Sequence, residues 1–366
     1  MPTQAYFDKY PSFPSDVSVV KLPRLSFAKL LAQEEGESDA LFEACRAIGF
    51  FLLDFRCCPE GEAFLEKAET MFDINQEVYA LGFDELMQYA YRPSHSLFGY
   101  KCIGDSKIED NKPDRHEFYN ISQDDMTGIS KLSNPPCIEA HRPGVKAYIE
   151  QAYSIVSLIC SHLDTQLRLT PGTLASLQPM SLSSGTALRM LRYPSQPVGD
   201  RRTSLRGHTD LGTLTILFNI TGGLQLLLPG TDPRDESSWV YVQPVPGCAI
   251  VGLGDTMVQW SAGILRSNMH RVTFAPGEQG EVTRYSLAYL VRPYSEAPMK
   301  RLSGGNSLIP ELEEGEEDTT INAREWEARR VAALRKGQDN TRSKGGREIK
   351  LEDKNKVSAV IVGRAE

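Results

Sequence analysis

Short apolar segments separated by turn residues fill the region from 186 to 293, and no other feature of the sequence restricts the fold as strongly. Gly, Pro, Asp and Asn stand between these segments. Short strands at regular spacing, separated by turn residues, are typical of a β-sandwich or a β-barrel. We therefore predict a β core over residues 179–300. The segments are TALRMLRYP, GTLTILFN, GLQLLLPG, WVYVQPVPG, CAIVGLGD, HRVTFAPG and RYSLAYLVRP.

The first part of the chain, residues 1–178, predicts mainly helices that pack on this core. Apolar residues recur there at helical spacings, while short apolar runs beside Pro or Gly indicate strands. Residues 92–137 are rich in loop-forming and aromatic residues. Together with the β core, these elements predict an α+β fold that is mainly β at its centre. Helices are expected at about 27–48, 60–80 and 142–168, and strands at 16–23 and 49–55.

The last part, residues 301–366, predicts little regular structure apart from one helix. Its acidic run ELEEGEED is expected to form a solvated loop. AREWEARRVAAL at 323–334 has helical periodicity, with Trp326 as its expected anchor on the core. The polar and charged composition after Lys336 predicts a flexible tail, in which KVSAVIVG at 356–363 is a candidate edge strand.

Composition and charge argue against several partners. The chain of 366 residues has a formal net charge of -8, which disfavours nucleic-acid binding because phosphate binding needs a cationic surface. A small anionic ligand stays compatible, because it needs only one or two cations. The N-terminus lacks a signal-peptide pattern, and the most apolar stretches are too short to span a bilayer. The seven cysteines are scattered and form no CxxC pair, which is typical of reduced thiols in the cytoplasm.

Two of the six histidines stand in a pattern that suits a metal ion. His208 and Asp210 lie two positions apart in RGHTDLGTLTIL, so on a strand both side chains would project from the same face. A neutral imidazole and a carboxylate that converge on one point suit a borderline divalent metal. A third ligand from another strand would complete a facial arrangement with open positions, as in Fe(II) oxygenases. His270, which opens HRVTF, is the best candidate for that ligand.

The alternative is that this pattern arose by chance and binds no metal, because an HxD spacing alone is common. The other four histidines lie in the N-terminal half, where helices and loops dominate. Of these, His116 and His162 are expected to be ordinary surface or core residues.

A second pair of residues suits an anion. Arg284 and Ser286 lie two apart in RYSLAYLVRP, so they share one face of a predicted strand. A guanidinium beside a hydroxyl can receive a carboxylate, because the planar fork binds it bidentately and the hydroxyl donates one more bond. Tyr193 in LRYP is a further possible donor to the same anion. The alternative is a solvent-facing Arg at the end of a strand.

Together these features resemble the isopenicillin N synthase-like family of Fe(II)- and 2-oxoglutarate-dependent dioxygenases. The family's pattern of HxD, a distal His and RxS is matched in order by His208 and Asp210, by His270, and by Arg284 and Ser286. The run from GGLQLLLPG to WVYVQPVPGCAIVGLGD, the segment EACRAIGFFLLDF and the strand LRYP resemble further family signatures. The resemblance covers roughly residues 15–335.

The resemblance implies a double-stranded β-helix, or jelly roll, whose mouth holds Fe(II) through His208, Asp210 and His270 as the catalytic ligands. It also implies 2-oxoglutarate as co-substrate, with one end on the iron and its far carboxylate on Arg284 and Ser286. Dioxygen is the third participant. Hydroxylation, desaturation, cyclisation or rearrangement of a small-molecule substrate would release succinate and CO2. An origin of that substrate in specialised metabolism is an analogy with the family.

Two features depart from the family's pattern. Many plant members carry Asn two residues before the Tyr that contacts the co-substrate carboxylate, whereas this chain has Leu191 before Tyr193. Isopenicillin N synthase also has an apolar residue at that position. The loop-rich stretch 92–137 matches the family only loosely, and family members shape their substrate pockets there. The identity of the substrate therefore does not transfer.

Residues of these loops, and one aromatic residue near the distal His, are candidates for substrate binding. The protein's part in such a reaction is to hold the iron, orient the substrate and exclude water. Core packing is the alternative for each candidate. The candidates are Phe98, Tyr100, Arg115, Phe118 and Trp260.

Two other functions compete with this interpretation. An oxidase of the isopenicillin N synthase type needs no 2-oxoglutarate, and there the substrate's own carboxylate would occupy the receptor of Arg284, Ser286 and Tyr193. Such an enzyme would turn over its substrate without yielding succinate. A non-catalytic jelly-roll binding protein would keep the fold without the chemistry, and the complete set of three metal ligands argues against it.

Overall fold

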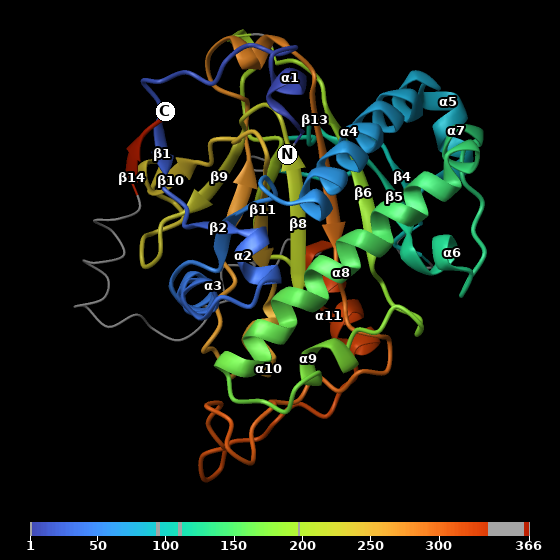
Figure 1. The fold of residues 1–366 in the computed structure, drawn as a ribbon. Coiled ribbons are helices and arrows are strands. Elements are labelled where there is room, and N and C mark those ends of the chain that lie inside the picture. The colour runs from blue at the N-terminus through green and yellow to red at the C-terminus, as the bar shows by residue number, and fades with distance from the viewer. Residues whose placement is uncertain (1, 93–95, 109–111, 197, 336–361, 366) are drawn as a thin grey trace.

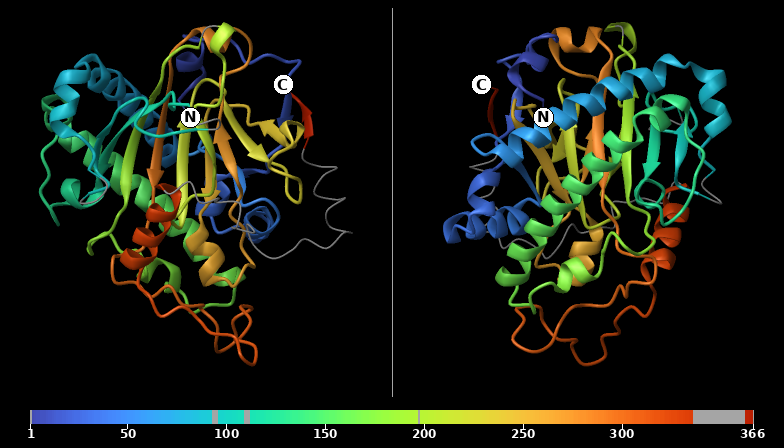
Figure 2. Two further views of the ribbon diagram at one scale, coloured as in Figure 1. Left: turned by 180° about the vertical axis from the view of Figure 1, so that it is seen from behind. Right: turned by 45° about the vertical axis from the view of Figure 1, so that its right-hand side comes forward.

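Two β-sheets lie face to face at the centre of the molecule, and long helices cover the outer side of the larger sheet (Figure 1; Figure 2). The computed structural model describes residues 2–92, 96–108, 112–196, 198–335 and 362–365. Helices and strands are both present, and the facing sheets form the jelly-roll core. The structure therefore confirms the predicted α+β fold with a mainly β centre.

Within the described residues, the larger sheet has eight strands and the smaller sheet has six. The order in the larger sheet is β2 (Arg24–Ser26), β3 (Phe50–Asp54), β11 (Cys248–Leu253), β8 (Leu214–Asn219), β13 (Arg284–Leu290), β6 (Ala187–Tyr193), β5 (Glu117–Ser122) and β4 (Gly99–Lys101). The order in the smaller sheet is β14 (Val362–Arg364), β1 (Ser18–Val20), β10 (Trp239–Tyr241), β9 (Leu224–Leu227), β12 (His270–Val272) and β7 (Leu205–His208).

The helices differ greatly in length, and the longest ones pack together outside the larger sheet (Figure 1). In chain order they are α1 (Gln4–Phe7), α2 (Phe27–Leu31), α3 (Glu35–Ala47), α4 (Pro59–Ala80), α5 (Phe83–Leu86), α6 (Gln123–Thr127), α7 (Pro136–Ala140), α8 (Arg142–Gln166), α9 (Thr173–Ser176), α10 (Asp255–Trp260) and α11 (Ala323–Arg335). In the part of the chain that the structure describes, no helix is both long and apolar enough to cross a membrane.

The neighbouring strands β3 and β11 of the larger sheet are buried on both faces. Both are nearly continuous apolar runs, as burial on two faces requires. On β3, the ring of Phe50 reaches His270 of the smaller sheet, with 5.4 Å between the ring centroids. Gly49 precedes β3 with φ 74°, and a Cβ there would lie 2.0 Å from the carbonyl oxygen of Arg266. Only glycine fits this turn from α3 into the sheet.

Helix α4 holds the backbone of β6 and β13 from outside the larger sheet. The side-chain amide of Asn75 donates hydrogen bonds to the carbonyl oxygens of Ser286, at 3.2 Å, and of Leu191, at 3.4 Å. The hydroxyl of Tyr79 donates to the carbonyl oxygen of Met190 at 2.8 Å. The helix therefore fixes the two strands whose other faces carry the predicted carboxylate receptor.

The predicted helices at about 60–80 and 142–168 correspond to α4 and α8, whereas the helix predicted over 27–48 is divided. Gln33, between α2 and α3, has φ 59°. This left-handed conformation interrupts a right-handed helix. The periodicity of apolar residues continues across the interruption, so the sequence pattern did not reveal it.

The N-terminal region contributes more strands than its sequence predicts. Strands β2 to β5 all belong to the larger sheet, and β4 and β5 come from the stretch 92–137 that we expected to form loops. Strand β5 contains polar residues at buried positions, so it lacks the apolar alternation of a typical strand. It pairs along its whole length with β6. The domain boundary between 178 and 179 stays a prediction, and this pairing joins the regions on its two sides.

The C-terminal region matches its predicted elements where the structure describes it. Helix α11 confirms the helix predicted at 323–334, and the acidic run at 311–318 forms a mainly exposed loop. Strand β14, which contains the last residues of the candidate strand at 356–363, pairs with β1. The rest of that candidate and the tail from residue 336 lie outside the described residues.

We predict that Asn75→Ala lowers the free energy of unfolding by about 1–3 kcal/mol, because two buried carbonyl oxygens lose their donor. Denaturant unfolding followed by circular dichroism measures the change. Gln76→Ala, at the next and exposed position of α4, is the matched control. An equal loss of stability in both variants would contradict the role given to Asn75.

Candidate active site

The pairing of two strands in the smaller sheet brings the two predicted metal-binding histidines together. His208 is the last residue of β7 and His270 is the first residue of β12, and the two are direct partners in the antiparallel register. Their ring centroids are 4.3 Å apart. Asp210 lies beyond the end of β7, not on the strand as predicted. The hydroxyl of Thr215 on β8 donates to its Oδ2 at 2.5 Å and orients the carboxylate.

The ligand atoms of these three residues converge on one point. Asp210 Oδ1 lies 3.8 Å from His208 Nε2 and 3.7 Å from His270 Nε2, and all three ligand atoms lie within 4.8 Å of one another. Each Nδ1 faces a backbone carbonyl oxygen, that of Arg206 at 2.9 Å and that of Asn268 at 3.2 Å. With a proton on Nδ1, each Nε2 keeps its lone pair for a metal ion.

The charge states at this point also suit a metal ion. Burial, together with the imidazole of His270, lowers the pKa of His208 to about 4 against the opposing effect of Asp210. Burial raises the pKa of the Asp210 carboxyl, but both imidazoles and Thr215 outweigh it, so this pKa lies below its ordinary value. Near neutral pH His208 is therefore an uncharged donor and Asp210 a carboxylate. Two imidazoles and one carboxylate on one side of a point are the donor set of a non-haem Fe(II) site.

Asp255 joins the two segments that carry the metal ligands. Its Oδ2 accepts a hydrogen bond of 2.9 Å from the hydroxyl of Thr209, and its Oδ1 accepts one from the hydroxyl of Ser267. Arg330 of α11 forms an ion pair with the same carboxylate. The sequence showed this residue only as part of a family signature, and its spacing did not reveal this role.

The predicted carboxylate receptor lies on the larger sheet and is buried. Arg284 is 4% exposed, its Nε donates to the carbonyl oxygen of Gly222 at 2.8 Å, and one terminal nitrogen donates to the hydroxyl of Ser286 at 3.1 Å. Its guanidinium carbon lies 4.6 Å from the ring centroid of Tyr193, its partner in the strand register. Burial lowers the pKa of Arg284, and Tyr193 opposes this effect.

No carboxylate among the described residues forms an ion pair with Arg284. A buried guanidinium without a counter-charge is unfavourable, so this site calls for an anionic ligand. Asn219 on β8 is fully buried directly opposite Ser286, and neither of its amide atoms has a hydrogen-bond partner in the described part of the chain. Its amide is therefore a further candidate donor beside Ser286, which sequence alternation alone did not identify.

His116 has a closer relation to this receptor than the sequence suggested. Its ring stacks on that of Tyr193 with 5.6 Å between centroids, and its Nδ1 lies 3.0 Å from the carbonyl oxygen of Ser204. Burial and the nearby Lys101 hold the pKa of His116 well below its usual range. A neutral His116 therefore supports Tyr193. His162 lies in the core, where its Nε2 faces the carbonyl oxygen of Leu30 at 3.0 Å.

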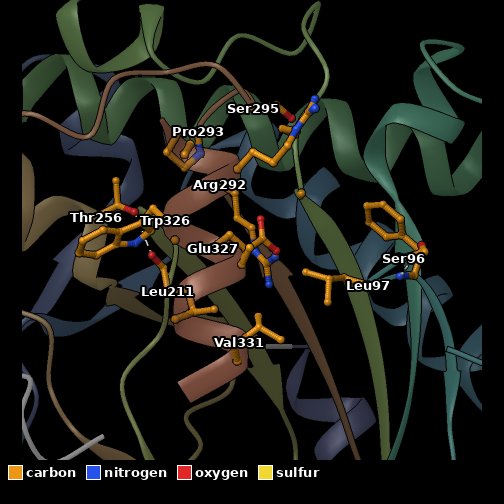
Figure 3. Close-up of a pocket in the computed structure, with 18 residues that line it drawn as sticks. Ser96, Leu97, Leu211, Thr256, Arg292, Pro293, Ser295, Trp326, Glu327 and Val331 are labelled. Atoms are coloured by element: carbon orange, nitrogen blue, oxygen red, sulfur yellow. Dashed lines mark hydrogen bonds and ion pairs between the residues drawn. The ribbon is translucent and has the colours of Figure 1, made fainter. Parts of the chain in front are cut away.

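A cavity of about 540 Å³ lies between α11 and the segment that directly follows Asp210 (Figure 3). Leu211 and Gly212, which directly follow Asp210, form one part of its wall, and α11 forms another. Inside this wall Arg292 forms an ion pair with Glu327 of α11. Helix α11 therefore covers the cavity and is tied to the core by ion pairs at Asp255 and Arg292.

The structure separates the five residues predicted to bind substrate. Phe98 lines this cavity, and Phe118 is buried on β5. Tyr100 donates to Glu117 and lines a different cavity of about 200 Å³. Arg115 is partly buried, and its backbone N–H donates to the carbonyl oxygen of Ser204. Trp260 is 1% exposed with its indole N–H on the carbonyl oxygen of Pro298, a position that favours core packing over substrate contact.

Comparisons with known proteins agree with this geometry. The model of the 2OG-Fe(II) oxygenase superfamily matches residues 185–293, and that of the N-terminal region of non-haem dioxygenases in morphine synthesis matches residues 17–137. The chain is 30% identical over 348 residues to a 2-oxoglutarate-dependent dioxygenase of Aspergillus fumigatus, covering 89% of this chain and 90% of the relative. A 2-oxoglutarate-dependent dioxygenase of a Dothideomycetidae species is 30% identical over 326 residues, covering 88% and 93%.

The chain belongs to the 2-oxoglutarate- and Fe(II)-dependent oxygenase superfamily. It is an oxidoreductase that uses Fe(II), 2-oxoglutarate and O2. Among the functions weighed from the sequence, the relatives favour the 2-oxoglutarate-dependent dioxygenase over the 2-oxoglutarate-independent oxidase and over a non-catalytic binding protein.

Solved structures show the same fold as this oxygenase. A Neurospora crassa protein in complex with α-ketoglutarate and thymine superposes with a TM-score of 0.70 at 20% identity, covering 86% of this chain and 97% of that one. A dioxygenase for auxin oxidation from rice superposes with a TM-score of 0.60 at 22% identity, covering 87% and 96%. The likeness confirms the jelly-roll fold that the sequence predicts for this oxygenase.

We predict that Asp255→Ala weakens metal binding by this oxygenase about 10- to 100-fold, because hydrogen-bonded supports of metal ligands have effects of this size. The substitution removes the acceptor shared by Thr209 and Ser267. Anaerobic Fe(II) titration measures the affinity. Asp232→Ala, which removes an exposed acid on a distant loop, is the control. Unchanged affinity in a folded Asp255→Ala variant would contradict the role of Asp255.

Proposed function

We propose that this oxygenase binds Fe(II) through His208, Asp210 and His270 and oxidises a small molecule of specialised metabolism. The supporting observation is that a second site, suited to an anion, accompanies the three ligands. Arg284 is buried on the opposite sheet with no carboxylate partner among the described residues. A metal site alone would suit many activities. A metal site together with a buried, unpaired guanidinium suits a co-substrate with two carboxylates.

In this proposal the far carboxylate of 2-oxoglutarate binds Arg284 and Ser286. The Nε of Arg284 donates to the carbonyl oxygen of Gly222, which orients the guanidinium. Its terminal nitrogens therefore remain to bind the anion. Tyr193 lies against the guanidinium and adds its hydroxyl as a possible donor, and the unpartnered amide of Asn219 lies next to Ser286. This arrangement orients 2-oxoglutarate with its other end toward the metal ligands.

Bound Fe(II) supplies the redox chemistry by which O2 and 2-oxoglutarate oxidise a substrate carbon, with release of succinate and CO2. The protein's own residues supply the positions. His208, Asp210 and His270 would bind the metal ion from one side and leave its other coordination positions open for 2-oxoglutarate and O2. The cover formed by α11 limits the access of water to the cavity, and Arg284 keeps the co-substrate in one orientation.

The cavity between α11 and the segment after Asp210 supports a small-molecule substrate. Its volume of about 540 Å³ is within the usual range for small-ligand sites. Phe98 stays a candidate for substrate contact there, and Phe118 stays a candidate on β5, although it does not line this cavity. We also propose a cytoplasmic enzyme without a nucleic-acid or membrane partner, supported by the net charge of -8 and by seven cysteines that are all free thiols.

We predict that His208→Ala, Asp210→Ala and His270→Ala each abolish tight Fe(II) binding and activity, because each removes one of three ligands. Anaerobic Fe(II) titration measures the binding, and substrate-dependent release of succinate measures the activity. His162→Ala, which removes a histidine of the core, is the control for the histidine variants. Iron affinity equal to that of the wild type in any ligand variant would exclude that residue as a ligand.

We predict that Arg284→Lys weakens 2-oxoglutarate binding about 10- to 100-fold while Fe(II) binding is retained, because an ammonium group cannot supply the bidentate fork. Anaerobic calorimetry with the Fe(II)-loaded protein measures 2-oxoglutarate affinity. Arg234→Lys, on an exposed loop, is the control.

Equal 2-oxoglutarate affinity in wild type and Arg284→Lys would refute the assignment of the receptor. Substrate turnover by the wild type without 2-oxoglutarate and without succinate would instead support the oxidase alternative.

A further inference from the structure

A second guanidinium without an acidic partner among the described residues lies on the same face of the larger sheet as Arg284. Arg189 stands on β6, four residues before Tyr193, so the two side chains project from the same face. In the register with β13, Arg189 lies opposite Ala288, and Tyr193 lies opposite Arg284. At about 3.3 Å per residue, the two positions on β6 are roughly 13 Å apart along the strand. Arg189 is therefore separate from the receptor proposed for 2-oxoglutarate.

The guanidinium of Arg189 is held on one edge and on one face. Its Nε donates to the Oδ1 of Asn120 at 2.8 Å, and its central carbon lies 4.2 Å from the ring centroid of Phe118. Asn120 in turn donates to the carbonyl oxygen of Leu97 at 2.6 Å, and Leu97 lines the large cavity. Among the described residues, no hydrogen bond engages the two terminal nitrogens of Arg189. These nitrogens form the edge of the fork that binds carboxylates bidentately.

The neighbouring arginines each have an acid, whereas Arg189 has none in the described part of the chain. Arg192, three residues later and on the opposite face of β6, pairs with Glu117 at 2.6 Å. Arg292 pairs with Glu327 of α11. Arg189 is only partly buried, although burial still lowers its pKa. An isolated cation on an inner sheet face is the arrangement that receives an anionic ligand.

Arg189 lies within electrostatic range of the proposed iron ligands without pairing with them. The carboxylate of Asp210 partly opposes the lowering of the pKa of Arg189 by burial. The charge of Arg189 adds to the effect of burial in lowering the pKa of Arg292 in the cavity wall. No ion pair joins Arg189 to Asp210 in the described structure. The charge of the Arg189 guanidinium is therefore not neutralised by an ion pair within the described structure.

We propose that Arg189 binds a carboxylate of the primary substrate, so that this oxygenase acts on an organic acid. The proposal rests on the proposed function, because Arg284 must be occupied by 2-oxoglutarate for a second carboxylate to select Arg189. Asn120 and Phe118 hold the fork in one plane, which lets both terminal nitrogens bind the two oxygens of a carboxylate. The ring of Phe118 also offers an apolar surface to the carbon chain of the acid.

This arrangement selects acids over their neutral analogues. A carboxylate forms two charge-assisted hydrogen bonds with Arg189, whereas an amide or ester of the same shape leaves the cation without a counter-charge in a partly dehydrated site. A difference of about 10- to 100-fold in affinity is expected, as for hydrogen bonds to a charged group. Because the acid is held at its carboxylate, the carbon that is oxidised lies along the chain, on the side toward the iron ligands.

The test uses the full-length protein loaded anaerobically with Fe(II) and saturated with N-oxalylglycine, which occupies the 2-oxoglutarate site. The probes are hexanoate, dodecanoate, 3-phenylpropanoate and cinnamate, each beside its primary amide, with binding measured by calorimetry. We expect the wild type to bind at least one acid about 10- to 100-fold more tightly than its amide. Arg189→Met removes this preference, and Arg189→Lys keeps part of it because the charge remains.

Arg234→Met is the matched control, because it removes one positive charge from an exposed loop and should keep the full preference. Equal affinity of the wild type for every acid and its amide would overturn the proposal, as would an undiminished preference in Arg189→Met. N-oxalylglycine affinity separates the two levels of inference. We expect Arg189→Met to bind N-oxalylglycine as tightly as the wild type does. If Arg284→Lys also bound N-oxalylglycine as tightly as the wild type, the proposed function itself would be contradicted.

Discussion

The antiparallel pairing of β7 with β12 is the contact on which the candidate site depends. It places His208 directly opposite His270 although the two residues are far apart in the sequence. Backbone hydrogen bonds along two strands fix such a register to within one residue, because a slip by one position would turn a side chain to the other face. The convergence of the imidazoles is thus set by the sheet, and only Asp210 needs a separate support, which Thr215 provides.

The two sheets carry different kinds of groups toward the space between them. The smaller sheet supplies both imidazoles, and the larger sheet supplies the guanidinium groups of Arg284 and Arg189. Helix α4 stabilises the larger sheet from outside through Asn75 and Tyr79, whose bonds reach the backbone of β6 and β13. The positions of the cations therefore depend on packing between the helix layer and the sheet as well as on strand pairing.

The sequence predicted the residue types that can do the chemistry, but it did not predict orientation. His208, Asp210, His270 and Arg284 were recognisable because their spacings repeat a known pattern, and the structure brings the first three together. Asp255 could not be assigned a role, because its partners come from three segments that meet only in the folded chain. The sequence alone does not distinguish Arg189 from Arg192 of β6. Because they are three positions apart on a strand, their side chains lie on opposite faces of the sheet, and of the two only Arg192 forms an ion pair with an acid in the described structure.

The ion pair between Arg330 and Asp255 has a consequence for the order in which the site is completed. The three candidate metal ligands and Arg284 all precede Arg330 in the chain, so the ribosome makes these residues before it makes α11. Domains can begin to fold during synthesis from the N-terminal end. A nascent chain can thus assemble the strands and the three candidate ligands while the cavity is still uncovered. The cavity would then be covered only when α11 has left the ribosome.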